Sequence, residues 1–265
     1  MSRKAIYLVM MLLLLVSVAA CSKPAATPTA TAPAGQSLAA AGNTYKVGTN
    51  AEYPPFEFVD NSGKVVGFDP DLLDAISQKT GVKFEIVNTR WDGIFVALQS
   101  GEFDAVASAA TITDERAQIV NFSDPYFNAG QMIAVRIEDK DKITKVSDLD
   151  GKKVGVQLGT TGDIWLTANT KAEISRYDEI TLAFQALANR DLDAVFNDGP
   201  VSADIIRSNP EMKVTLVGSP VTDEFYGIAV NKGKPELLEA INVGLAAIRA
   251  DGTYDQIYNK WFGTP

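Results

Sequence analysis

Two charged residues, Arg116 and Asp198, each follow one copy of a repeated ten-residue phrase. Residues 97–106 read ALQSGEFDAV and residues 186–195 read ALANRDLDAV. A guanidinium binds a carboxylate through two hydrogen bonds, and a carboxylate binds an ammonium group. If the two copies lie in two similar lobes, the two side chains would together bind both charges of a free amino acid. Five identities in ten also fit chance in apolar sequence, so the structure has to test the repeat.

Both charged residues also have purely structural explanations. Arg116 fits a surface arginine on a short helix that begins at Thr113, because arginine is mostly exposed. Asp198 fits the N-cap of a helix that begins at Gly199 and Pro200, a position that aspartate favours. For Asp198 the two roles are compatible.

Strand-like and helix-like segments alternate along the part of the chain that carries these residues. A turn is expected at residues 60–63, between two extended pieces, and a further helix from about residue 163. The other expected strands are residues 45–48, 83–87, 103–107, 153–157, 173–176 and 194–196, and the other expected helices are residues 71–79, 91–99, 181–188, 201–208 and 235–258, with a break at 251–252. This alternation predicts an α/β fold with a mainly parallel sheet.

Two more extended pieces, residues 131–136 and 226–231, lie on either side of the second block of alternating elements. We expect them to be paired connections between two lobes. The first lobe then comprises residues 44–130 and 228–265, and residues 131–227 form an inserted second lobe. A cleft between two lobes is a favoured site for a small ligand.

The N-terminus has the pattern of a secretory signal peptide. Arg3 and Lys4 precede an apolar run over residues 6–16, which is shorter than the roughly 20 residues of a membrane-spanning helix. Small residues then lead to Cys21, the only cysteine of the chain. This resembles the lipobox of bacterial lipoproteins, with Val18 where leucine is usual, and implies a signal peptide over residues 1–20 and a lipid such as palmitate on Cys21. An ordinary signal peptide with an incidental cysteine is the alternative.

Residues 21–43 are rich in Ala, Pro and Thr and show no periodicity. We expect a semi-extended tether that reaches at most about 70 Å, at about 3.1 Å per residue.

The composition excludes several classes of function. The chain has 24 basic and 33 acidic residues, a net charge of −9, and no basic run, so nucleic acid is not an expected partner. The absence of histidine excludes Cys/His zinc sites and His-dependent acid–base catalysis. A single cysteine allows no internal disulfide, and no cofactor or metal is expected.

Five stretches of residues 44–265 resemble the bacterial extracellular solute-binding proteins of the polar amino-acid family (family 3), the receptors of ABC importers. The stretches are residues 48–57 (GTNAEYPPFE), 67–72 (GFDPDL), 112–116 (ITDER), 122–126 (FSDPY) and 252–254 (GTY) with 261–262 (WF). Their order and spacing make the resemblance strong. Pro70 departs from the aliphatic residue that is usual there, but proline is tolerated at a helix start.

The resemblance implies a two-lobed, periplasmic-binding-protein-like fold of type II with two hinge strands. It implies an amino-acid ligand, the membrane subunits of an ABC permease as partners, and a monomer that the lipid on Cys21 anchors outside the cytoplasm, in the periplasm or on the outer face of the cell membrane.

The resemblance also assigns roles to residues. It implies that Arg116 binds the ligand carboxylate and that Asp198 binds the ligand ammonium. Thr111 and Thr161 would contact these groups through backbone N–H groups and the Thr111 hydroxyl, and Ala109 would contribute its backbone.

Four further positions match those that surround the ligand side chain. Tyr53 and Trp91 match flanking aromatic positions, although each also fits a core residue, and Asn50 and Gln157 match positions that read the side chain. Since neither of these is Lys or Arg, the sequence argues against glutamate or aspartate as ligand. Two aromatic faces, an amide pair and a negative protein suit an arginine guanidinium and would also suit glutamine. Residues 131–136 and 156–164 look most like arginine or basic amino-acid receptors, so the resemblance favours arginine.

Two other functions remain compatible with this fold. One is a dehydratase similar to cyclohexadienyl dehydratase, acting on prephenate or arogenate, for which Glu52 or Asp198 would supply the acid. The other is a sensory protein that presents its ligand-bound form to a signalling partner.

Overall fold

The computed structural model describes residues 39–263. The expected signal peptide over residues 1–20, the lipidation site Cys21 and most of the tether over residues 21–43 lie outside the described residues. Near the start of the described range, Ala40 is fully buried, and the Gly42 N–H donates to the Gly81 carbonyl at 2.9 Å.

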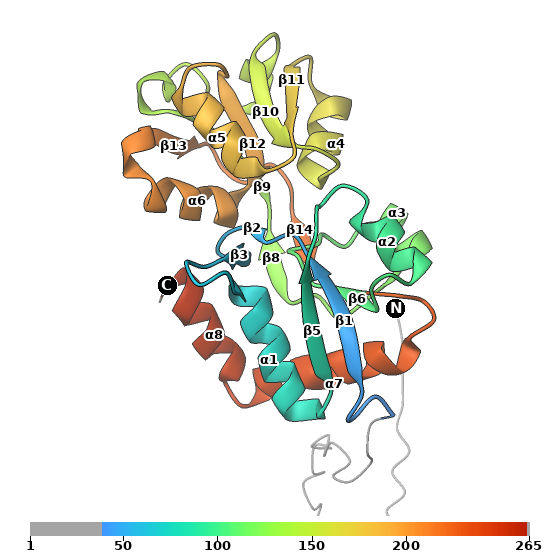
Figure 1. The fold of residues 1–265 in the computed structure, drawn as a ribbon. Helices are drawn as coiled ribbons and strands as arrows, with labels where there is room; N and C mark the ends of the chain where they lie inside the picture. Colours follow the sequence, from blue (N-terminus) through green and yellow to red (C-terminus); the bar gives the residue numbers. More distant parts are fainter. Residues whose placement is uncertain (1–38, 264–265) are drawn as a thin grey trace, which may run out of the picture. The chain divides into compact units, whose positions relative to one another are not determined.

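Two five-stranded sheets of equivalent topology organise the described chain (Figure 1). The first sheet has the order β5 (Lys83–Asn88), β1 (Thr44–Thr49), β6 (Ala105–Val106), β15 (Ala229–Val230), β7 (Asn121–Phe122). The second sheet has the order β11 (Glu173–Tyr177), β10 (Lys153–Gln157), β12 (Ala194–Asp198), β9 (Gln131–Arg136), β13 (Val214–Val217). We call the parts built on the first and second sheets lobe 1 and lobe 2.

Each sheet is mixed rather than mainly parallel. In both, the first three strands of the spatial order are parallel, and the fourth strand runs antiparallel to its neighbours. The α/β class and the two-lobed architecture are confirmed.

Helices cover both sheets. In lobe 1 they are α1 (Phe68–Thr80), α2 (Ile94–Ser100), α3 (Asp114–Ile119), α7 (Pro235–Ala250) and α8 (Thr253–Phe262), with α1 packed against α7 and α8. In lobe 2 they are α4 (Thr161–Asn169), α5 (Ile180–Ala188) and α6 (Gly199–Ser208), with 3₁₀ turns η1 (Ile137–Asp139), η2 (Val146–Leu149) and η3 (Pro210–Met212). A small sheet of β2 (Glu52–Tyr53), β3 (Glu57–Val59) and β4 (Val65–Val66) extends lobe 1.

The strands between the lobes are β8 (Phe127–Ala129) and β14 (Glu224–Tyr226), which pair with each other (Figure 1). The prediction that residues 131–136 and 226–231 are paired connections was therefore wrong. Residues 131–136 form β9 in the centre of lobe 2, and β15 pairs with β6 and β7 in lobe 1. The crossings are three-residue strands, too short to show an alternating pattern.

A glycine sets the start of α1 behind the cleft. Gly67 has φ 142°, and a Cβ there would lie 2.1 Å from the Phe56 carbonyl oxygen, so no other residue fits. Pro70 lies in the first turn of α1, where its missing N–H costs nothing. This helix start places Asp69 inside lobe 1, where it is 2% exposed.

The repeated phrase has the same structure in both lobes. Each copy ends a helix and begins a strand, and the fifth residue of each, Gly101 or Arg190, is left-handed with φ 86° or 74°. In copy one, Asp104 accepts from the Lys46 N–H at 2.9 Å, and its own N–H donates to the Lys46 carbonyl at 2.9 Å.

In copy two, Asp193 makes the same two bonds to Lys153, at 2.9 and 2.8 Å. The repeat thus fixes a helix–strand turn against β1 in lobe 1 and against β10 in lobe 2.

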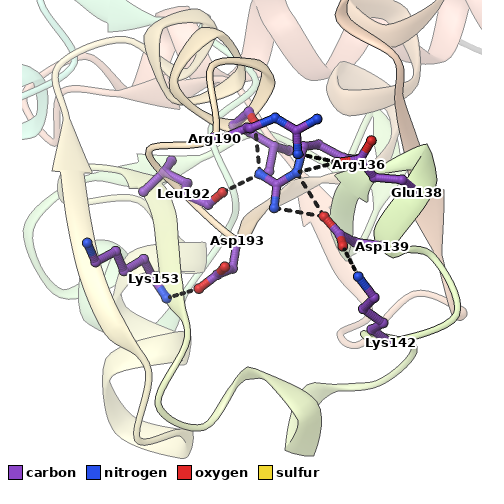
Figure 2. Close-up of polar contacts among 9 residues, drawn as sticks. Arg136, Glu138, Asp139, Lys142, Lys153, Arg190, Leu192 and Asp193 are labelled. Carbon is purple, nitrogen blue, oxygen red and sulfur yellow. Dashed lines mark hydrogen bonds and ion pairs between the residues drawn. The ribbon is translucent and has the colours of Figure 1, made fainter.

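A neighbouring strand also secures the turn in each lobe. Arg136, at the end of β9, donates to the carbonyl of Leu187 at 3.0 Å and to that of Leu192, and pairs with Asp139 (Figure 2). In lobe 1, Asn231 follows β15 and donates to the carbonyl of Leu98, the same position of the phrase. Backbone acceptors at the helix end are therefore satisfied in both copies.

Candidate functional site

A small cavity of about 20 Å³ lies between the lobes, and all nine residues expected to form a site line it. Its lining consists of Asn50, Tyr53, Glu57, Trp91, Ser108, Ala109, Thr111, Arg116, Gln157, Thr160, Thr161 and Asp198. Sequence reasoning did not identify Glu57, Ser108 and Thr160. Two of them had a simple signal, because Ser108 and Thr160 adjoin the expected residues Ala109 and Thr161.

Arg116 is held by the first turn of α3. Thr113 caps this helix by accepting from the Arg116 N–H at 3.2 Å, and Arg116 Nη1 donates to the Thr111 carbonyl at 2.8 Å. The guanidinium carbon lies 5.2 Å from the Trp91 ring centroid and 4.6 Å from that of Phe95. Burial lowers the pKa of Arg116 to about 10. The helix begins where the structural alternative placed it, but the guanidinium lines the cavity.

Asp198 lies at the end of β12 and is 6% exposed. It occupies the N-cap position of α6, yet its side chain makes no capping bond. Instead its carboxylate accepts from Tyr53 Oη at 2.8 Å, from Tyr226 Oη and from Gln131 Nε2. Burial, and secondarily the charge of Glu224, raises its pKa to about 6.

Neither charged group has an oppositely charged partner in the part of the chain that the structure describes. Within residues 39–263, no carboxylate forms an ion pair with Arg116 and no Lys or Arg with Asp198. Leaving a buried charge unpaired is costly, so the pair can accept one ligand that carries both a carboxylate and an ammonium group.

The two threonines face each other across the cleft from lobe 1 and lobe 2. Their hydroxyl oxygens are 3.5 Å apart, and both donate to Glu224 Oε2, Thr111 at 2.9 Å and Thr161 at 2.7 Å. Glu224 belongs to the β14 hinge strand and was missed from the sequence. The signal was its position just before Tyr226, where a connection between the lobes was already expected.

Asn50 and Gln157 also meet across the cleft. Gln157 Nε2 donates to Asn50 Oδ1 at 3.1 Å and to the Asp178 carbonyl at 3.0 Å, while Asn50 Nδ2 donates to the Thr89 carbonyl at 3.2 Å. Their remaining polar atoms provide a neutral surface at this part of the cavity, which can accept or donate hydrogen bonds.

Tyr53 and Trp91 have different surroundings. Tyr53, 7% exposed, contacts lobe 2 through hydrogen bonds to Asn197 at 2.9 Å and to Asp198. The prediction that Trp91 begins a helix was wrong: α2 begins at Ile94, because Gly93 before it is left-handed with φ 83°. Trp91 is half-buried in the preceding turn and lies beside Arg116.

Ala109 has φ 45°, an uncommon value for a residue with a Cβ. Its N–H donates to Asp69 Oδ2 at 3.0 Å. The carbonyl oxygen is therefore the backbone group with which Ala109 can meet a ligand, and a carbonyl suits an ammonium group.

No group of three or more His, Cys, Asp or Glu side chains within residues 39–263 is arranged to hold a metal ion. Over the same residues, none of the helices combines the length and apolar character needed to cross a bilayer.

Comparison with known proteins identifies a family. The model of the bacterial extracellular solute-binding proteins, family 3, matches residues 45–264. A "Probable histidine-binding protein" of Neisseria gonorrhoeae is 39% identical over 229 residues, which cover 83% of this chain and 84% of that protein. The ABC transporter arginine-binding protein 1 of Escherichia coli K12 is 36% identical over 230 residues, covering 84% and 93%.

Solved structures agree with these relatives. An ancestral arginine-binding protein bound to arginine superposes with a TM-score of 0.79 at 48% identity, covering 83% of this chain and 98% of that one. An ancestral arginine-binding protein bound to glutamine superposes with a TM-score of 0.78 at 49% identity, with the same coverage.

Proposed function

Because the chain belongs to the bacterial extracellular solute-binding proteins of family 3, we propose that it is an extracytoplasmic receptor that holds one free amino acid between its two lobes. The observation that carries this is the pair of charged groups, Arg116 and Asp198, that line one cavity without partners of opposite charge among the described residues.

In this proposal Arg116 binds the α-carboxylate, and Asp198 binds the α-ammonium together with the Ala109 carbonyl. Backbone N–H groups at Thr111 and at Thr161, the first residue of α4, add donors for the carboxylate. The ligand contacts both lobes, so it stabilises their closed arrangement by the difference between its affinities for the closed and open forms.

We favour arginine over glutamine as the ligand. Asn50 and Gln157 offer amide oxygens to a guanidinium, Tyr53 and Trp91 offer aromatic faces, and the protein is acidic. A relative named for arginine and an ancestral protein bound to arginine support this choice. The ancestral protein bound to glutamine keeps glutamine as the alternative ligand.

The ligand-bound receptor would deliver its amino acid to the membrane subunits of an ABC permease, as the name of the Escherichia coli relative suggests. A lipid on Cys21, with residues 22–43 as a tether, would hold it as a monomer beside that permease. Metabolic labelling with a palmitate analogue, with Cys21→Ala as control, tests the anchor.

A thermal-shift screen against the common amino acids, followed by calorimetry, tests the function. Saturable stabilisation by arginine or lysine is expected, and stabilisation by glutamine alone would overturn the choice of ligand. Failure of every amino acid to bind would overturn the receptor itself.

Turnover of prephenate or arogenate is not expected. Glu52, one of the two acids that a dehydratase would use, is not among the residues that line the cavity. Burial and the charge of Glu179 raise the pKa of Glu52, but this happens outside the cavity.

A further inference from the structure

Two buried acidic residues, Glu57 and Asp69, support the part of the cavity wall formed by Ser108 and Ala109, and Glu57 itself also lines the cavity. Glu57 is 0% exposed on β3, and Asp69 is 2% exposed in the first turn of α1. Glu57 Oε1 accepts from Ser108 Oγ at 3.0 Å, and Asp69 Oδ2 accepts from the Ala109 N–H at 3.0 Å and from Tyr126 Oη at 2.8 Å. One oxygen of each acid is thus already occupied.

The other two oxygens, Glu57 Oε2 and Asp69 Oδ1, are fully buried, and no other donor within residues 39–263 reaches them. Each carboxyl group acts on the pKa of the other, Asp69 through its charge and a side-chain hydrogen bond and Glu57 through that hydrogen bond. No Lys or Arg in the described range forms an ion pair with either acid. Two adjacent carboxylates with no cation would repel each other in a medium of low polarity.

We propose that Glu57 and Asp69 share one proton between Glu57 Oε2 and Asp69 Oδ1, and that this proton-linked pair positions the Ser108–Ala109 wall of the amino-acid site. A carboxylic acid is a donor and a carboxylate an acceptor, so one proton satisfies both buried oxygens. The positioning role rests on the proposed function, whereas the shared proton does not.

The pair reaches three residues of the cavity. Asp69 holds the Ala109 N–H and with it the left-handed backbone of that residue. Glu57 holds Ser108 Oγ, which in turn accepts from the Asn50 N–H at 2.9 Å. Disrupting the pair would therefore displace the backbone of Ala109, where the ligand ammonium is expected, and also the backbone of Asn50. Asp69 is not among the residues that line the cavity, so it acts on the site only through Ala109.

The proton resides on Glu57. Burial, and next the charge of Asp69, raises the pKa of Glu57 well above its usual range. Burial raises the pKa of Asp69 only to about 6, because the Ala109 N–H and Tyr126 hydroxyl bonds oppose the shift. Above about pH 6, Asp69 is therefore the acceptor and Glu57 the donor.

The tyrosines near the pair do not change charge between pH 6 and 8, whereas Asp198, with a pKa of about 6, does so in the lower part of this range. Burial raises the pKa of Tyr126 well above its usual range and that of Tyr254 to about 12. Burial and Asp198 raise the pKa of Tyr53, and that of Asp198 is about 6. Between the usual glutamate pKa and the raised pKa of Glu57, the folded protein holds one proton on Glu57 that the unfolded chain has released, so stability falls as pH rises.

Amide substitutions test the shared proton. In Glu57→Gln the amide N–H₂ donates to Asp69, and in Asp69→Asn it donates to Glu57, so each variant keeps one hydrogen between the groups and the net charge of the pair. The double variant places two N–H₂ groups against each other. We expect Asp69→Asn, which changes a residue outside the cavity lining, to bind the amino acid within about threefold of wild type, and the double variant to bind roughly tenfold or more weakly than Asp69→Asn.

A pH series gives a readout that does not need the ligand. Over the pH range in which Glu57 stays protonated only in the folded protein, the unfolding equilibrium constant of the wild type should rise with pH more steeply than that of Glu57→Gln, by up to about tenfold per pH unit. Exposed Glu102, in the same lobe, provides the control Glu102→Gln, which should keep the wild-type slope. The infrared C=O band of a neutral carboxylic acid should be present at pH 7 in the wild type and in Glu102→Gln, and lost in Glu57→Gln and in Asp69→Asn.

Several results would overturn the proposal. They are a single variant that fails to fold, binding by Asp69→Asn as weak as that of the double variant, an unchanged pH slope in Glu57→Gln, or no neutral-acid band. If the slope and the band behave as expected but no amino acid binds, the shared proton stands and the proposed function fails.

Discussion

Arg116 is positioned for a carboxylate before any ligand arrives. Its guanidinium lies over Trp91 and Phe95 and makes one bond to a carbonyl, which leaves donors for an anion in a site from which much water is excluded. Exposed arginines pair with nearby acids, as Arg207 does with Asp204. Within residues 39–263 Arg116 forms no such pair, which supports its proposed role as a ligand-binding residue rather than a surface arginine.

Arg116→Ala should weaken amino-acid binding by roughly 2–5 kcal/mol, because a buried carboxylate loses its partner. Calorimetry measures this, with Arg207→Ala as the matched control, since that residue is exposed and lies away from the cavity. Near wild-type affinity in Arg116→Ala would remove this residue from the site.

Asp198 should make binding depend on pH. The ammonium group binds the ionised carboxylate, and the pKa of Asp198 in the free protein is about 6, so affinity should fall about fivefold between pH 6 and 5 as the acid becomes protonated. Asp198→Asn should bind weakly with little pH dependence. An affinity that stays constant from pH 7 to 5 would contradict the assignment.

The same raised pKa has the opposite effect on the stability of the ligand-free protein. Between the usual aspartate pKa and about pH 6, the folded state binds a proton that the unfolded state has lost, so the contribution of Asp198 increases as pH falls. Affinity and stability should therefore change in opposite directions over this range.

At the scale of elements, the repeated phrase is a scaffold with the same two-bond contact in each lobe. Asp104→Ala and Asp193→Ala should each lower the free energy of unfolding by about 0.5–1.5 kcal/mol, since each removes a bond to a backbone N–H. Asp104→Ala should cost more, because Asp104 also pairs with Lys234 at 3.1 Å. Denaturant unfolding measures both, and a tenfold loss of ligand affinity in either would show that the phrase does more than support the fold.

The elements were predictable wherever apolar periodicity was long enough. Strands β1, β5, β10 and β11 and the helices over residues 235–262 match the expected segments closely, because one buried face repeats over several residues. The hinge strands β8 and β14 were not predictable, since a three-residue strand is too short to show an alternating apolar pattern. The start of α2 was missed because the conformation of Gly93 is not visible in an apolar pattern.

The site was predictable only in part. Resemblance to a family placed nine residues, and the structure brings all of them to one cavity. Glu57 and Glu224 could not be found that way, because their positions depend on the packing of β3 and β14 across the cleft. Their surroundings in the sequence, a stretch that resembles the family for Glu57 and an expected connection for Glu224, did not by themselves indicate a role in the site.

At the scale of the whole molecule, the two lobes meet through polar contacts that surround the cavity. Glu224 accepts from a threonine of each lobe, and Tyr53 reaches Asn197 and Asp198 from lobe 1. The exposed pair Arg90–Asp178, at 2.8 Å, adds little to this, since exposed ion pairs contribute about 0–1 kcal/mol. The hinge therefore contributes a charge that acts on the site.

Glu224→Gln should lower the pH at which binding is half lost. The variant keeps an oxygen for the two threonines but removes the charge that helps to raise the pKa of Asp198. Calorimetry as a function of pH measures the midpoint. Exposed Asp223, which bonds Asn128 in the same strand pair, supplies the control Asp223→Asn. A midpoint that does not move would show that Glu224 acts on Asp198 through structure rather than charge.

The central claim is that Arg116 recognises the α-carboxylate of a free amino acid. Calorimetry of wild type and Arg116→Ala with arginine and with agmatine, which is arginine without its carboxylate, tests it most directly. We predict that wild type binds arginine far more tightly than agmatine, by roughly 2 kcal/mol or more, and that Arg116→Ala loses this preference. If Arg116→Ala weakens both ligands equally and keeps the preference, the claim is contradicted.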